Sequence, residues 1–178
     1  LLASVPAKAA WVVRLDAKAL LAGQTGAWLR EHVAQAEPAA KLAAVEAIFG
    51  FNPLRDLDTV VAAGASNRPE DAVLALMGRF DRQRLTTLAR AAEGFTETRH
   101  GDDVVLSWAD KGERHHGCFV TDNLLVLARA PAPVLAVLDV RRGRAAGLPA
   151  DAFPGFEADP GFLVGAVSDP GRVGGPSA

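Results

Sequence analysis

The order of apolar and polar residues predicts strands and helices in mixed order in the first half of the chain. Runs rich in β-branched and aromatic residues predict strands over residues 11–15, 59–63 and 72–80. Asp16 follows the first strand as a helix N-cap, and apolar residues at helical spacing then predict three helices. The first covers residues 17–22, the second contains Trp28, Leu29 and Val33, and the third has Pro38 in its first turn and ends at Gly50.

The second half of the chain predicts a group of short strands with a helix on either side. Asp81 begins a helix that ends at Gly94. Pro131 precedes a last helix over residues 132–142. Between the two helices, turn formers separate strands predicted over residues 95–99, 104–109, 115–121 and 124–128. These strands predict an antiparallel meander.

This order of elements predicts the α+β class. We expect one antiparallel, meander-rich sheet with helices packed on one of its faces. Strictly alternating βαβ units and Gly-rich phosphate-binding fingerprints are missing from the sequence, which argues against a Rossmann fold.

The sequence also predicts a boundary near residue 146. Residues 1–146 form the predicted α+β domain, whereas residues 147–178 are rich in Gly and Pro and contain one strand-like run, at 162–167. That run is followed by Ser168 and Asp169, which repeats the pattern of the first strand and Asp16. The segment is therefore either the start of a second, similar unit or an ordinary strand in a chain rich in Ala and Val.

The composition is that of a globular domain whose positive and negative charges nearly balance. The 178 residues are 49% hydrophobic and 22% charged, with a formal net charge of −2. A chain of this length buries roughly two-thirds of its unfolded surface, so it needs no disulfide or metal to hold a core. The 19 basic and 21 acidic residues are scattered, which disfavours nucleic acid as a partner. No apolar run approaches the roughly 20 residues of a transmembrane segment.

The N-terminal residues and the single cysteine bear on the compartment. The chain does not begin with Met and contains the small-residue pattern Ala7-Lys8-Ala9, which is typical of the end of a signal peptide. A boundary just before the first strand explains these residues equally well. Cys118 alone cannot form an internal disulfide, and its apolar strand predicts a buried, inert thiol rather than a nucleophile.

Two short motifs carry a resemblance. Residues 51–60 read FNPLRDLDTV, and residues 78–85 read GRFDRQRL. They resemble uncharacterised, mostly exported bacterial proteins in which an F-x-P-x-x-D-(I/L)-D segment runs into a hairpin and a G-x-F-D-x-x-x-L segment begins a helix. The resemblance implies this fold and a periplasmic or secreted location. It implies no activity and no functional residue.

Polar residues with metal-binding or catalytic chemistry gather in the meander, at His100, Asp102, Asp103, His115, His116 and Cys118. With a loop over residues 110–114, Trp108 lies opposite His116. Alternation then places His116 and Cys118 on one face of the sheet and His115 on the other. A His-x-Cys pair supplies two zinc ligands, whereas a catalytic site needs three protein ligands. His100 lies about 20 Å away at roughly 3.4 Å per residue, so we expect no bound metal or cofactor, and the candidate ligands are His115, His116 and Cys118.

Two charged groups have both a chemical and a structural interpretation. Asp56 and Asp58 form either a metal-binding or acid/base carboxylate pair or a solvated turn at the start of a strand. A second group, Arg141, Arg142 and Arg144, forms either an anion-binding patch or the positive complement to the negative end of the last helix.

These observations favour a non-enzymatic, exported domain that binds an unknown protein or a small ligand. The sequence contains no complete catalytic constellation. The alternative is a small metal-dependent or acid/base hydrolase that uses His115, His116 and the carboxylates between residues 100 and 116. A third interpretation is a structural unit of a larger repeat assembly. A clustered, exposed His and Asp set would favour the enzyme, and an exposed apolar patch of more than a few hundred Å² would favour binding.

Overall fold

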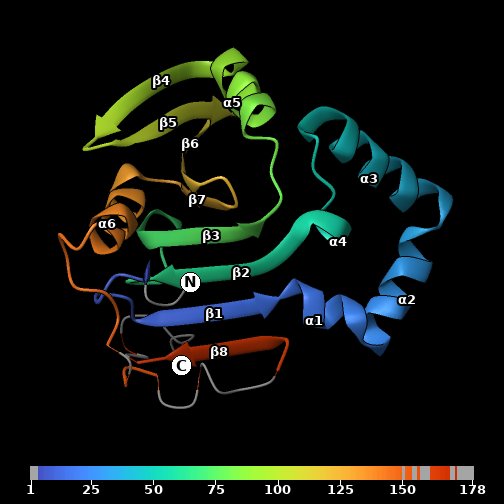
Figure 1. Cartoon of the computed structure of the whole chain (residues 1–178), viewed down its shortest axis with the longest axis horizontal. Coiled ribbons are helices and arrows are strands. Elements are labelled where there is room, and N and C mark those ends of the chain that lie inside the picture. Colours follow the sequence, from blue (N-terminus) through green and yellow to red (C-terminus); the bar gives the residue numbers. More distant parts are fainter. Residues whose placement is uncertain (1–3, 150, 154–155, 157–160, 169–170, 172–178) are drawn as a thin grey trace.

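A computed structural model of the chain describes residues 4–149, 151–153, 156, 161–168 and 171. Eight strands form one sheet in the order β4-β5-β6-β7-β3-β2-β1-β8, which runs from top to bottom in Figure 1. Every neighbouring pair is antiparallel. The predicted α+β class and the meander, which is formed by β4 to β7, are confirmed.

The first part of the chain contributes two interior strands near one edge of the sheet and a group of helices. In chain order it forms β1 (Trp11–Asp16), α1 (Ala17–Ala22), α2 (Gln24–Val33), α3 (Ala36–Phe49), α4 (Pro53–Asp56) and β2 (Leu57–Gly64). The Asp16 side chain accepts a hydrogen bond from the Ala19 amide, so it caps α1 as expected. Gly50 ends α3 in the left-handed conformation, with φ of 64°. The helices α1 to α3 form an arc beyond one end of the strands (Figure 1).

The rest of the chain forms the remaining strands and two further helices. In chain order these are the 3-10 turn η2 (Pro69–Asp71), β3 (Ala72–Gly78), α5 (Arg82–Ala91), β4 (Glu93–His100), β5 (Asp103–Asp110), β6 (Glu113–Thr121), β7 (Leu124–Ala128), α6 (Pro131–Arg141) and β8 (Leu163–Val167). The side chain of Asp81 accepts a hydrogen bond from the Arg84 amide and caps α5. Among the described residues, none of the helices has the length and apolar character needed to cross a membrane.

The turn between β5 and β6 corrects the expected register. Lys111 and Gly112 both have positive φ, at 50° and 81°, and Asp110 pairs with Glu113. A two-residue turn with both central residues at positive φ matches the right-handed twist of the strands. The loop is therefore shorter than the predicted residues 110–114, and the pairing shifts by one residue: Trp108 lies opposite His115, and His116 lies opposite Ser107 rather than Trp108.

The sheet has apolar side chains on both faces, and one face holds the core. Strand residues such as Val12, Val61 and Val126 are fully or almost fully buried there, in the same apolar cluster as Val134 and Leu138 of α6. The rest of this cover comes from residues before β1 and after α6, namely Val5, Ala9, Phe153 and Phe156. We call this the core face of the sheet.

The helices are divided between the two faces. α6 packs on the core face, whereas Leu85 and Leu88 of α5 lie over Leu106 and Phe119, whose side chains point to the opposite face. We call that side the second face. The expected packing of the helices on one face is therefore corrected: α6 and α5 cover different faces, and α5 covers only part of one.

The segment after residue 146 joins the same sheet. The strand predicted at residues 162–167 is present as β8, which pairs antiparallel with β1, and Phe153 and Phe156 pack into the core. Asp169, which belongs to the repeated pattern, lies outside the described residues.

Candidate functional site

The two neighbouring histidines of β6 point to opposite faces of the sheet, as alternation predicts. The His115 ring stacks on Trp108 on the second face, with ring centroids 5.8 Å apart. His116 lies on the core face, where its Nδ1 is 2.8 Å from the hydroxyl oxygen of Ser107. The two imidazoles therefore cannot share a ligand.

The Ser107–His116 pair has the atoms of a nucleophile and a base, but it is buried. His116 is 8% exposed and Ser107 is 7% exposed. Burial lowers the pKa of His116 below its ordinary value, because the charged imidazolium is disfavoured away from water. The hydrogen bond satisfies two polar groups that the core would otherwise leave without a partner.

Cys118 lies on the core face and is 1% exposed. Its face of the sheet carries Val105 and Val126, because Leu106 lies opposite Gly117 in the observed register. Burial raises the pKa of the Cys118 thiol to about 11, so the thiolate is a minor species at neutral pH.

His100 and Asp103 contact α6 and the loop after it. The Nε2 atom of His100 is 2.7 Å from a carboxylate oxygen of Asp139, to which Arg144 also donates at 2.8 Å. The buried Asp103 accepts two hydrogen bonds from Arg142, at 3.0 and 2.6 Å, and these hold the pKa of Asp103 below its ordinary value. Both groups thus fasten the β4–β5 hairpin to the end of α6, and Asp102 is exposed beside them.

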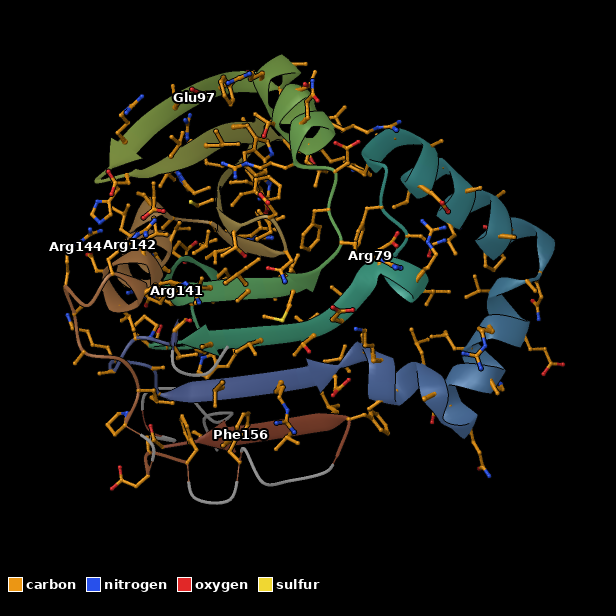
Figure 2. The ribbon with its side chains drawn as sticks, in the orientation of Figure 1. Arg79, Glu97, Arg141, Arg142, Arg144 and Phe156 are labelled. Atoms are coloured by element: carbon orange, nitrogen blue, oxygen red, sulfur yellow. The ribbon has the colours of Figure 1, made fainter. Side chains whose placement is uncertain are left out.

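The three arginines after α6 do not form an open anion site. Figure 2 shows them together at the end of this helix. Arg141 donates to the Ser4 hydroxyl at 3.0 Å, while Arg142 and Arg144 are engaged by the carboxylates of Asp103 and Asp139. Arg141 and Arg142 therefore tie the helix end to other segments, whereas Arg144 pairs with Asp139 of α6 itself.

Asp56 and Asp58 also have separate partners. Asp56 is 6% exposed and accepts hydrogen bonds from Arg55, from Arg79 and from the Asn52 amide. The hydrogen bond from Arg55 is the main reason that its pKa lies below the ordinary value. Asp58 instead pairs with Lys18 at 2.8 Å. Asp56 therefore joins α4 to the end of β3, where Figure 2 labels Arg79, and the two carboxylates form no common site.

The structure brings none of the predicted site residues into one cluster. Within the described part of the chain, no three His, Cys, Asp or Glu side chains are placed to hold a metal ion together. His115, on the second face, borders a cavity.

A cavity of about 510 Å³ lies between α5 and the second face of the sheet. Its walls come from the end of α3, from α5, and from strands β5 to β7: Ile48, Phe49, Leu85, Leu88, Ala89, Ala92, Leu106, Trp108, Ala109, Asp110, Gly117, Phe119, Leu125 and Leu127. Arg84 holds the end of α3 in place because its guanidinium donates to the carbonyl oxygens of Ala47 and Ile48.

A second cavity of about 380 Å³ continues along the same face over β2, β3 and β7. It shares Trp108 and Leu127 with the first. The Trp108 ring lies over Gly117, where an added Cβ would be 3.3 Å from the ring and 2.9 Å from Leu127. Because Gly117 has no side chain, the Trp108 indole can lie over it, between the two cavities. We call the two cavities together the trough.

Few polar groups border the trough. Asp110 borders the first cavity, and His115 and Arg129 border the second. Arg129 also pairs with Glu113 at 2.9 Å, and both of these side chains are exposed. The trough is therefore an apolar surface with charged groups at its margin.

No family model, curated protein or solved structure matches this chain.

The buried His116 predicts a specific pH dependence of stability. Because its pKa is lowered from 6.5 in the folded state, the unfolded chain binds a proton first, and stability falls as the pH drops below about 6.5. The free energy of unfolding is measured in urea between pH 7.5 and pH 5. We expect the contribution of His116 to lower it by up to about 1.4 kcal/mol per pH unit. The His116→Asn variant should lose that component. Wild-type and variant curves that stay parallel would contradict the prediction.

Proposed function

We propose that this protein is a non-enzymatic binding domain and that the trough is its contact surface for an apolar ligand or side chain. The observation that carries the proposal is the 510 Å³ cavity between α5 and the sheet. Ligand sites are typically clefts of about 300–1,000 Å³ with mostly apolar walls and a few polar groups. The cavity has this size and this lining.

The extent of the trough supports the same function. Leu74 and Ala62 extend the apolar surface over β3 and β2 from Leu127, so the trough runs across several strands. Trp108, which borders both cavities, offers a large and rigid aromatic contact. At the margin, His115 and Arg129 supply hydrogen-bond donors that would orient an acidic or carbonyl group of the ligand.

The positions of the titratable residues favour binding over hydrolysis. A hydrolase in this region would need His115, His116 and a carboxylate in one site. His115 and His116 lie on opposite faces, and the nearby Asp103 is held by Arg142. Each group instead has a structural partner, which leaves the apolar surface as the feature without a structural role.

The proposal includes a periplasmic or secreted location. It is supported by the resemblance carried by residues 51–60 and 78–85. The Ala7-Lys8-Ala9 segment adds little, because Val5 and Ala9 are buried in the core and Ser4 receives a hydrogen bond from Arg141. Fractionation of the producing cells tests this part, and recovery of the protein only from the cytoplasm would contradict it.

The trough is tested with the fluorescent probe 1-anilinonaphthalene-8-sulfonate. We expect the native protein to bind it, and Ala92→Leu and Ala62→Leu to weaken binding about tenfold, because each added side chain fills one of the cavities. Ala43→Leu is the matched control, since Ala43 is exposed on α3 outside the trough. Urea unfolding confirms that all variants are folded. Equal binding by the three variants, or none by the native protein, would overturn the proposal.

A further inference from the structure

The edge strand β8 has the properties of an interior strand. It pairs antiparallel with β1 over its whole length, with Gly165 opposite Val13. On its other side, no strand of the described residues pairs with it. Exposed edge strands usually carry charged residues or proline, which prevent pairing with other chains. The five residues of β8, LVGAV, contain neither.

β8 also corresponds to β1 residue by residue. A rotation of half a turn about an axis through the Val13–Gly165 pair exchanges the two strands. Under this rotation Leu163 takes the position of Trp11, and Val167 takes the position of Leu15. The faces correspond as well. Val12 is buried on the core face, and Val164 packs against the same core. A half-turn of this kind relates the strands of any antiparallel pair, and what is particular to β8 is that Val164 takes the place of Val12 in the core.

The ends of the two strands correspond too. The Asp16 amide donates to the Phe162 carbonyl at 2.7 Å, and the Ser168 amide donates to the Ala10 carbonyl at 2.8 Å. These two hydrogen bonds are exchanged by the same half-turn. Asp16 caps α1, and at the corresponding place after β8 stands Ser168, another residue preferred as an N-cap.

β8 differs from β1 in lacking an outer neighbour among the described residues. β1 has β2 on its far side, and Trp11 and Leu15 are half-buried. The corresponding Leu163 and Val167 are 59% and 50% exposed. By the alternation of antiparallel hydrogen bonds, the amides of Leu163, Gly165 and Val167 point away from β1. They form a ready-made edge for one more strand.

We propose that β8 is the first strand of a second unit of this fold in the same polypeptide, and that this unit continues the sheet. Its own second strand would pair with the outer edge of β8 as β2 pairs with β1. The β1–β8 pair would then be the joint between two units related by a half-turn. β8 is already paired with β1 in this sheet. This continuity favours a following segment of the same polypeptide, rather than a separate molecule, as the strand that pairs with its outer edge.

The experiment compares amide hydrogen exchange in the 178-residue chain and in the full natural polypeptide. We expect the amides of Leu163, Gly165 and Val167 to exchange rapidly in the former and about a hundredfold or more slowly in the latter. The amides of Val164 and Ala166, which face β1, serve as internal controls and should be protected in both.

A pair of proline variants gives a second measurement. Gly165→Pro removes an N–H that points away from β1, and an added Cβ there would be 3.6 Å from Val13, an ordinary contact. We expect it to lower the melting temperature of the full polypeptide more than that of the 178-residue chain. Ala166→Pro removes a bond to β1 and should destabilise both.

Three results would overturn the proposal. One is a natural polypeptide without a second run of this element order after β8. Another is protection of the outward amides already in the 178-residue chain, since its own residues or a second copy would then occupy the edge. The third is equal exchange of these amides in the two proteins.

Discussion

Apolar side chains on both faces of one sheet are the constraint on which the rest of the structure depends. In β7, Val126 is fully buried on the core face, while Leu125 and Leu127 point to the second face. Each face needs a covering layer, because apolar surface left in water costs roughly 25 cal/mol per Å². α6, Phe153 and Phe156 cover the core face. On the second face, α5 and the end of α3 leave the trough open.

The charged residues serve this layered arrangement. Arg142 and Asp103 join α6 to β5, and Asp56 joins the short helix α4 to Arg79 at the end of β3. Both carboxylates have pKa values below the ordinary range, as expected for groups whose charged form is held by arginine. Asp56 and Asp103 are thus committed to joining helices to the sheet.

The sequence was informative where a local signal decides the structure. Asp16 and Asp81 cap their helices, and the order of strands in the meander follows from its turns. The β5–β6 register was wrong by one residue because Lys111, which is not a glycine, takes a positive φ beside Gly112. No propensity of Lys indicates that conformation.

The trough was missed for a different reason. Strands such as β7 are apolar at every position, so alternation does not show which face is covered and which is open. One signal was present in Gly117, because a glycine inside a strand often marks the close approach of another group. Here that group is the Trp108 ring. The separation of His115 from His116 was predictable, since it depends only on alternation.

The chain's three tryptophans allow the most direct test of the trough as the contact surface. Their indole N–H signals in a ¹H–¹⁵N NMR spectrum report on β1, on α2 and on the trough. On titration with 1-anilinonaphthalene-8-sulfonate, the account predicts that the Trp108 signal moves, while Trp28, which is 61% exposed on α2, stays in place. Movement of the Trp28 signal with an unchanged Trp108 signal would contradict it.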